Sequence, residues 1–166
     1  MKPQLFEIPG RWKGKLYIVA RPRGGDWLDD ELASLHGAGV DVLVSLLEPQ
    51  EAGQLGLGSE EEAAVRAGLE FFSLPVKDRG VPYSRSEFAA AVSRLEADLE
   101  SGRAVAIHCR QSVGRAGMAA VAILVESGVC VEEAVELVSK VRGVAVPETA
   151  EQLEWLRGIL SGVRFL

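Results

Sequence analysis

Cysteine and histidine are scarce in this sequence, with only two of each among 166 residues. The two cysteines, Cys109 and Cys130, are too few and too far apart for a disulfide framework or a zinc site. Free thiols are typical of a reducing compartment. No apolar run approaches the ~18 residues that a membrane span needs, and residues 1–10 lack the apolar centre of a signal peptide. We therefore expect a cytoplasmic protein with no membrane association.

Basic charge is also in deficit, with 18 Lys and Arg against 24 Asp and Glu and a net charge of −6. This balance argues against a general nucleic-acid binder, which would present a basic surface. Hydrophobic residues make up 48% of the chain and charged residues 25%, as in ordinary globular proteins. The length predicts one domain over residues 1–166 with a single core. It leaves the oligomeric state open, with a monomer favoured.

The most informative stretch runs from Ala104 to Gly117. Residues 104–108 form a short, mostly apolar run that suits a buried strand. After Arg115, apolar residues recur at helical spacing as far as Gly128. The pattern predicts a strand that runs into a tight loop, and a helix that begins in that loop.

This arrangement has a chemical consequence for the side chains in the loop. The first backbone N–H groups of a helix have no partner within it and, together with the helix dipole, favour an anion such as phosphate. Cys109 stands where the strand ends, so its thiol is expected at the floor of that site, and the same field favours the thiolate. Arg115 follows in the same loop, and its planar guanidinium can hold two phosphate oxygens at once. These residues predict phosphoryl transfer to cysteine.

His108 and Cys109, five further residues, Arg115 and then Gly117 resemble the signature loop of the cysteine-dependent protein tyrosine phosphatase superfamily. The chain resembles the compact dual-specificity members more than the larger tyrosine-specific enzymes. The resemblance implies that Cys109 is the nucleophile and Arg115 the clamp, with His108 supporting the loop from behind. It implies neither a metal nor an organic cofactor. The loop residues that it implies as phosphate ligands are Arg110, Gln111, Ser112, Val113, Gly114 and Arg115.

Two positions of the loop depart from the family pattern. Ser112 stands where glycine is usual, and Ala116 stands where Ser or Thr usually follows the arginine. If the backbone at Ser112 needs a positive φ, the serine costs on the order of 1 kcal/mol or more. These departures keep open a different function, that of a phosphate-binding module with little turnover.

A second loop supplies a candidate general acid. Residues 75–82 follow an expected strand and contain Asp78, well before Cys109 in the chain. Parallel sheets bind ligands at the carboxyl ends of their strands, so we expect the two loops to meet. The order and approximate spacing resemble those of the family's general-acid loop, in which an aspartate protonates the leaving oxygen. Asp78 is therefore the candidate acid, with Glu48 and Glu51 on another loop as the alternatives.

Strand and helix patterns alternate along the rest of the chain. This alternation predicts parallel crossovers and an α/β fold, with a central, mostly parallel sheet flanked by helices. The expected strands are residues 15–20, 40–47, 69–74 and 104–108. The expected helices start near residues 26, 59, 84, 115, 131 and 147, with Asp26 as an N-cap, Pro147 in a first turn, and capping boxes at Ser59 with Glu62, Ser84 with Glu87 and Thr149 with Gln152.

The remaining polar residues lead to plainer expectations. Arg21 and Arg23 are expected in a solvated loop, with added charge at the mouth of the site as the alternative. Cys130 is expected to be buried without a redox role. Gln152 resembles a glutamine that often follows proline in the last helix of such phosphatases, which makes it only a minor catalytic candidate.

The expected function is hydrolysis of phosphomonoesters through a phosphocysteine intermediate, with phosphotyrosine, phosphoserine or phosphothreonine in proteins as substrates. Nucleotides, inositol phosphates and RNA 5′ ends are the alternatives. Phosphoinositide-type members of the superfamily tend to place lysine at the first and fourth variable positions of the loop. Arg110 and Val113 occupy them here, so only one is basic. The expected partner is therefore a phosphorylated protein or a small phosphomonoester.

Overall fold

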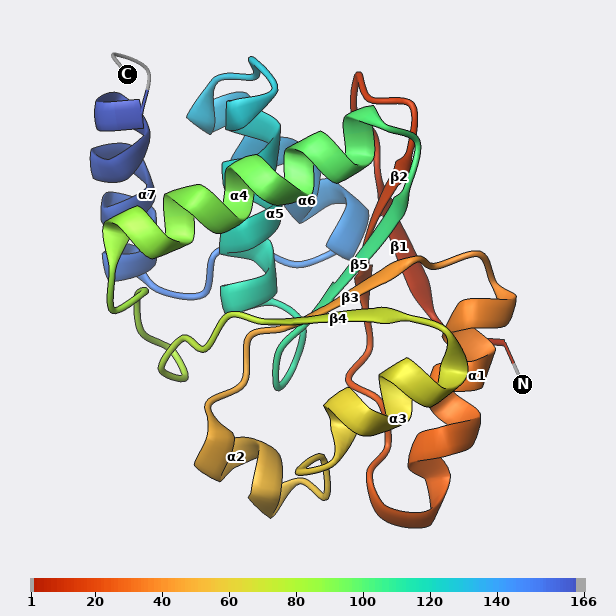
Figure 1. Ribbon diagram of the computed structural model, residues 1–166. Coiled ribbons are helices and arrows are strands. Elements are labelled where there is room, and N and C mark those ends of the chain that lie inside the picture. The colour runs from red at the N-terminus through yellow and green to blue at the C-terminus, as the bar shows by residue number, and fades with distance from the viewer. Residues whose placement is uncertain (1, 164–166) are drawn as a thin grey trace.

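Five strands form one mixed sheet in the computed structural model, which describes residues 2–163 (Figure 1). The strands are β1 (Leu5–Ile8), β2 (Lys15–Val19), β3 (Val42–Ser45), β4 (Glu70–Ser73) and β5 (Ala104–His108). Their order across the sheet is β1-β2-β5-β3-β4, and β1 alone among them pairs antiparallel with its neighbour. The predicted α/β fold with a mostly parallel sheet is confirmed.

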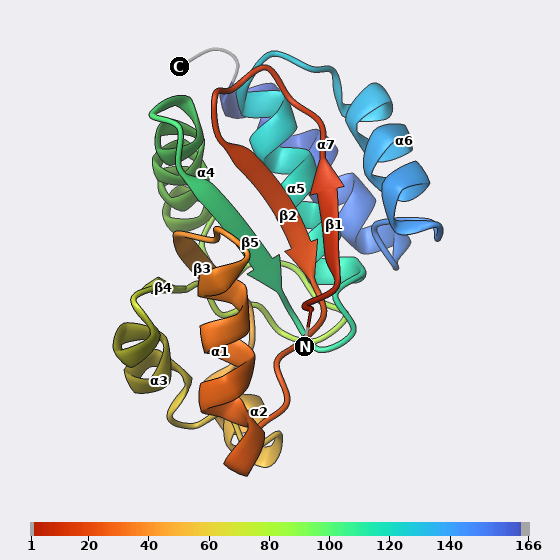
Figure 2. The ribbon, with the colours of Figure 1, turned by 90° about the vertical axis from the view of Figure 1, so that its right-hand side faces the viewer.

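Helices cover both faces of this sheet. They are the short 3-10 helix η1 (Gly25–Trp27), then α1 (Leu28–Gly37), α2 (Pro49–Gln54), α3 (Glu60–Ala67), α4 (Arg85–Glu100), α5 (Gly114–Glu126), α6 (Val131–Arg142) and α7 (Ala150–Val163). α1 and α3 lie on one face, and α4, α5, α6 and α7 gather on the other (Figures 1 and 2). Among residues 2–163, no helix is both long and apolar enough to cross a membrane.

The central strands are apolar on both sides because each face of the sheet is buried. In β2, Leu16 and Ile18 pack into the core beneath α4, α5 and α6, while Tyr17 and Val19 pack into the core beneath α1 and α3. The alternation follows from the two-residue period of a strand. All five residues of β5 are buried, as expected for a strand inside a parallel sheet.

The sequence analysis did not predict β1 or α2. β1 is a four-residue strand at the edge of the sheet, and Glu7 interrupts its apolar character. The start of α2 is marked by a capping box between Glu48 and Glu51, with Pro49 in the first turn. The segment was expected to be a loop because the helix is only six residues long and ends in a glycine-rich stretch.

Several predicted helix starts were wrong in detail. Asp26 lies inside η1, so the residue before α1 is Trp27 rather than an aspartate cap. Ser59 stands at the N-cap of α3 but its side chain makes no capping bond. Pro147 precedes α7 rather than lying in its first turn. At α4 the expected Ser84 cap is present, accepting a hydrogen bond from a backbone N–H at 3.2 Å.

The topology brings three loops to one edge of the sheet. β3, β4 and β5 run parallel, so their carboxyl ends lie at the same edge. The segments that leave them lead to α2, to the loop of residues 74–84 and to α5. This is the edge at which parallel sheets bind ligands. The candidate residues Glu51, Asp78 and Cys109 lie in the segments that leave the sheet there.

Candidate active site

The loop between β5 and α5 forms the centre of the site. Cys109 follows β5 directly and is 3% exposed, and α5 begins at Gly114. In the part of the chain that the structure describes, the backbone N–H groups of residues 110–115 donate to no protein acceptor. Amides at a helix N-terminus that lack partners are the usual protein ligands of phosphate. The geometry therefore suits an anion held above the Cys109 thiol.

Backbone strain is concentrated at this site. Ser112 has a φ of +56° and Arg79 a φ of +59°, and they are the two non-glycine residues with positive φ among residues 2–163. Such conformations cost on the order of 1 kcal/mol or more for a residue with a side chain. Part of that cost is offset at Ser112, whose Oγ accepts a hydrogen bond from the Cys109 N–H at 3.4 Å. The positive φ that the family's glycine would favour is thus present in this chain with serine.

His108 and Glu60 form a buried pair beneath the loop. Their Nε2 and Oε2 atoms are 2.6 Å apart, and the two side chains are 0% and 3% exposed. The other ring nitrogen, Nδ1, lies 3.3 Å from the carbonyl oxygen of Cys109. Both ring nitrogens are therefore held, one by the Glu60 carboxylate and the other by the backbone of the loop. Glu60, which the sequence analysis did not single out, therefore fixes the orientation of His108.

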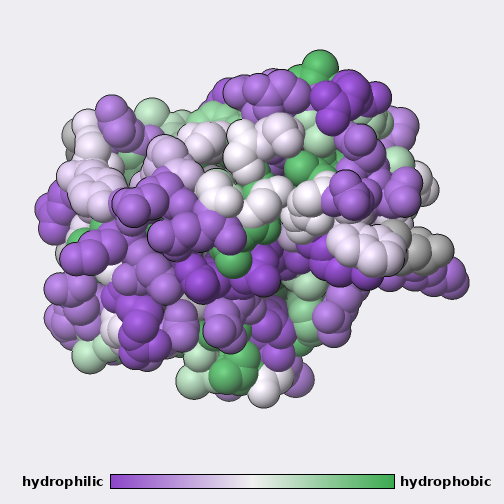
Figure 3. Space-filling model, turned by 90° about the horizontal axis from the view of Figure 1, so that it is seen from below, coloured by the Kyte–Doolittle hydropathy of each residue, from purple (hydrophilic) through white to green (hydrophobic). Residues whose placement is uncertain are grey.

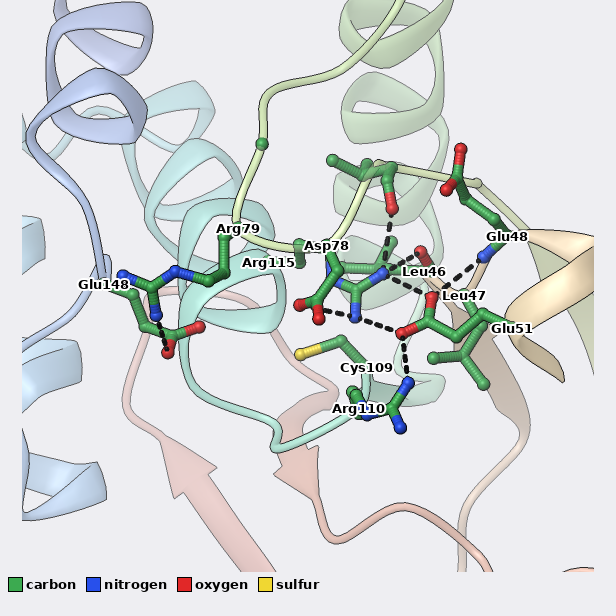
Figure 4. A network of polar contacts seen from close by, with 12 residues as sticks. Leu46, Leu47, Glu48, Glu51, Asp78, Arg79, Cys109, Arg110, Arg115 and Glu148 are labelled. Carbon is green, nitrogen blue, oxygen red and sulfur yellow. Dashed lines mark hydrogen bonds and ion pairs between the residues drawn. The ribbon is translucent and has the colours of Figure 1, made fainter. Parts of the chain in front are cut away.

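Arg115 is held from several sides (Figure 4). Its two terminal nitrogens donate to the two carboxylate oxygens of Glu51, each at 2.8 Å, and it is only 2% exposed. Nη1 also donates to the Val76 carbonyl at 2.8 Å, and Nη2 donates to Asp78 Oδ1 at 3.1 Å. Burial opposes the charge on Arg115, but hydrogen bonding to Glu51 and the charges of Cys109, Glu51 and Asp78 outweigh it and raise its pKa. The guanidinium is therefore oriented before any substrate binds.

Glu51, considered above as an alternative acid, has a different environment from the one an acid needs. The hydrogen bond from Arg115 lowers the pKa of Glu51, although burial opposes this. A carboxyl whose pKa is lowered stays ionised and is a poor proton donor near neutral pH. The arrangement makes Glu51 a partner that aims the guanidinium.

The loop that carries Asp78 is fastened on its far side by the segment leading into α7. Arg79 pairs with Glu148 at 3.2 Å (Figure 4). Gln152 donates through Nε2 to the Gly80 carbonyl at 3.0 Å. The Gln152 Oε1 atom accepts the backbone N–H of Glu148 at 3.0 Å, and the side chain is fully buried. Gln152 thus joins α7 to the Asp78 loop, and the predicted box with Thr149 is confirmed by their reciprocal bonds of 3.1 and 3.2 Å.

Two glycines of the signature loop allow this segment to approach. A Cβ atom on Gly114 would lie 2.4 Å from Glu148 Oε1, and one on Gly117 would lie 2.8 Å from Val146 Cβ. Contacts that short do not occur between real side chains, so both positions need glycine or a shift of the neighbouring segment. The glycines therefore let residues 146–148 pack against the first turn of α5.

A hydrophilic hollow of about 250 Å³ opens between α2, the Asp78 loop and Arg110 of the signature loop. Figure 3 views the molecule from below Figure 1 and shows hydrophilic residues covering much of that face. Tyr83, at the end of the Asp78 loop, hydrogen-bonds Glu48 on the rim, and this bond raises the pKa of Tyr83. The hollow is lined by Glu48, Gln50, Glu51, Gln54, Asp78 and Arg110.

The structure brings Cys109, Arg115 and Asp78 together at one place, although Asp78 comes from a separate loop (Figure 4).

Two expectations about residues outside this group were wrong. Cys130 is exposed rather than buried, because it precedes α6 at the surface. Arg21 is not simply solvated, since it donates to the carbonyl oxygen of Arg110 at 2.9 Å. β2 and β5 are neighbours, so the loop that leaves β2 runs beside the signature loop.

Comparison with solved structures supports the fold. A kinase associated phosphatase (KAP) with serine in place of its catalytic-site cysteine matches with a TM-score of 0.90 at 16% identity, covering 99% of this chain and 97% of that one. The active form of Tk-PTP matches with a TM-score of 0.79 at 28% identity, covering 97% and 99%. PTPMT1 matches with a TM-score of 0.71 at 21% identity, covering 89% and 92%. No curated protein sequence matches the chain.

One protein-family model also matches, over residues 19–129, and is described as "Polymorphic toxin system, DSP-PTPase phosphatase". The matched region runs from the end of β2 to just beyond α5, and so contains both Asp78 and the whole signature loop. The buried cysteine, the free amides above it and the oriented arginine are what a phosphatase of this kind requires. The chain belongs to the DSP-PTPase phosphatase family, within the cysteine-dependent protein tyrosine and dual-specificity phosphatase superfamily.

Proposed function

We propose that this protein hydrolyses phosphomonoesters through a phosphocysteine intermediate on Cys109, and that its substrates are phosphorylated proteins. The observation that carries the proposal is the loop itself. Six consecutive backbone N–H groups without protein acceptors, at residues 110–115, follow the buried thiol of Cys109 in the loop that also carries Arg115. Such an arrangement stabilises the extra negative charge that a phosphoryl group develops on its equatorial oxygens.

In the first step the Cys109 thiolate attacks phosphorus, and an S–P bond forms as the bond to the leaving oxygen breaks. Asp78 Oδ1 accepts a hydrogen bond from Nη2 of Arg115, so a bound phosphate would compete for that nitrogen and displace the aspartate toward the leaving group. A protonated Asp78 then transfers its proton to the leaving oxygen.

In the second step water attacks the phosphocysteine. Asp78, now ionised, accepts a proton from that water as the S–P bond breaks and Cys109 returns as the thiolate. Inorganic phosphate leaves. Ala116 is fully buried in the first turn of α5 and has no hydroxyl with which to stabilise the returning thiolate. The backbone amides and Arg115 carry that charge in this chain.

Replacing Asp78 with asparagine tests the acid role. The substitution keeps the side-chain size and an oxygen for Arg115, but removes the transferable proton. We expect the loss in kcat/KM to be about 10²–10⁴-fold for alkyl phosphates with poor leaving groups, and far smaller for p-nitrophenyl phosphate. Glu48→Gln, on the same hollow, is the matched control and should not change this leaving-group dependence. A uniform loss across leaving groups in Asp78→Asn would contradict the assignment.

The charge around the hollow supports a phosphoprotein substrate. Three carboxylates and one guanidinium, from Glu48, Glu51, Asp78 and Arg110, lie on its walls. A ligand with several phosphates would meet repulsion there, whereas a side chain with one phosphate places its charge in the cradle and neutral backbone on the rim. A lipid substrate is the competing class, since one structure of PTPMT1, 20% identical to this chain, was solved with PI(5)P.

A substrate panel distinguishes these classes. It comprises phosphotyrosine, phosphoserine and phosphothreonine peptides, nucleotides, inositol phosphates and PI(5)P vesicles, with phosphate release measured and Cys109→Ser run in parallel to exclude contaminating phosphatases. We expect at least one phosphopeptide to be hydrolysed with a kcat/KM about tenfold or more above every polyanionic substrate, a difference of about 1.4 kcal/mol. A higher kcat/KM for inositol phosphates, nucleotides or PI(5)P would overturn the proposed substrate class while leaving the chemistry of Cys109 intact.

A further inference from the structure

The carbonyl oxygens on the outer side of the signature loop are bonded by donors from outside the loop. The oxygen of Arg110 accepts Nη1 of Arg21 at 2.9 Å. The oxygen of Ser112 accepts Nε of Arg142 at 2.8 Å. The oxygen of Cys109 accepts from His108, as described above. Three peptide groups of the loop are therefore anchored, from the loop after β2, from the end of β5 and from the end of α6.

A hydrogen bond that fixes a carbonyl oxygen also fixes the direction of the N–H in the same peptide group. A trans peptide is planar, and its C=O and the N–H of the next residue point in opposite directions. Bonding the Arg110 oxygen outward therefore turns the N–H of Gln111 inward, and bonding the Ser112 oxygen outward turns the N–H of Val113 inward. These are two of the amides that lack acceptors over residues 110–115.

Arg142 is itself held in place. Its guanidinium carbon lies 4.2 Å from the centre of the Phe6 ring, so the side chain stacks on β1 while it reaches the loop. The peptide that it bonds follows Ser112, whose positive φ leaves the loop strained at that point. A charged, stacked donor there opposes relaxation of the strained peptide, since charge-assisted hydrogen bonds are about twice as strong as neutral ones.

We propose that Arg21 and Arg142 are positioning residues that orient the phosphate-binding amides of Gln111 and Val113 from behind. Neither would touch the substrate. The inference rests on the proposed function, because it assumes that these amides bind the transferred phosphate. It assigns a role to two arginines that lie outside the signature motif, and α6 supplies one of them.

Arg142→Met tests the proposal, because methionine keeps an apolar stem against Phe6 but donates no hydrogen bond. We expect the Kd for tungstate, measured by titration calorimetry, to rise about tenfold and kcat/KM for p-nitrophenyl phosphate to fall by about the same factor or more. Arg21→Met should give the same pattern independently. The matched control is Arg94→Met on α4, which removes an arginine stacked 4.7 Å from Phe72 and paired with Glu70, both on the edge strand β4.

The outcomes separate this inference from the proposed function. If wild-type protein binds no tungstate, the phosphate cradle is wrong and the proposed function fails. If wild type binds tungstate and both variants keep its Kd and kcat/KM, with only a lower melting temperature as in Arg94→Met, the two arginines are merely structural and the inference is overturned. If Arg142→Met does not fold, Arg21→Met decides by the same criteria, and Arg142→Lys, which keeps charge and a donor, provides the second variant on α6.

Discussion

Replacing Cys109 with serine is expected to reduce hydrolysis of p-nitrophenyl phosphate to background, while the folded protein still binds tungstate. The substitution exchanges one sulfur for oxygen at a site that is 3% exposed, so the packing of the loop barely changes. A serine hydroxyl is a far weaker nucleophile here, because no neighbouring base in the loop is placed to activate it. The amides of residues 110–115 and Arg115 remain, and the affinity for an oxyanion remains with them.

The chain offers a matched control for this experiment. Cys130→Ser removes the other cysteine, which is exposed and lies outside the site. Its activity should equal that of the wild type, with or without EDTA in the assay. Turnover that survives in Cys109→Ser, or that is lost in Cys130→Ser, would contradict the assignment of the nucleophile.

Arg115→Lys is expected to lower kcat/KM by about 10³-fold even though the positive charge is kept, on the scale of losing one preorganised donor. Lysine presents one ammonium where Arg115 presents a planar pair of nitrogens. It cannot bridge both oxygens of Glu51 and also donate to Asp78 in the geometry that the guanidinium has. The loss should therefore appear in activity and in tungstate affinity together.

Arg103→Lys is the matched control for that substitution. Arg103 also pairs with two carboxylates, Glu70 at 2.8 Å and Asp98 at 3.0 Å, but it lies at the opposite end of β5 from Cys109. We expect its kcat/KM to match the wild type, with at most a small change in melting temperature. Equal, near-normal kinetics in Arg115→Lys and Arg103→Lys would mean that Arg115 is not the phosphate clamp.

The features that could be predicted from the sequence are the local ones. The nucleophile, the arginine and the helix that starts between them lie within one continuous stretch, so spacing and periodicity are enough to place them. Apolar runs on β2, β3 and β5 are long enough to identify central strands, and their alternation with helices implies the parallel sheet. Asp78 could be proposed because parallel strands end at one edge, so its loop had to lie close to Cys109.

The partners of these residues could not be predicted, because each is distant in sequence. Arg21 and Arg110 are 89 positions apart, and Glu60 and His108 are 48 positions apart. Glu51 looked like an alternative acid as long as its contact with Arg115, 64 positions away, was unknown. From the sequence alone, a charged residue in a loop or a first helical turn is predicted to be solvated. Only the fold shows whether a buried opposite charge lies next to it.

The most direct test of the account is the identity of the covalent intermediate. Wild-type protein is mixed with p-nitrophenyl phosphate, quenched in acid during turnover and digested, and the peptides are analysed by mass spectrometry. The account predicts a phosphate adduct on the peptide that contains Cys109, absent from Cys109→Ser and unchanged in Cys130→Ser. Steady turnover without any adduct, or an adduct on a different residue, would contradict the phosphocysteine mechanism.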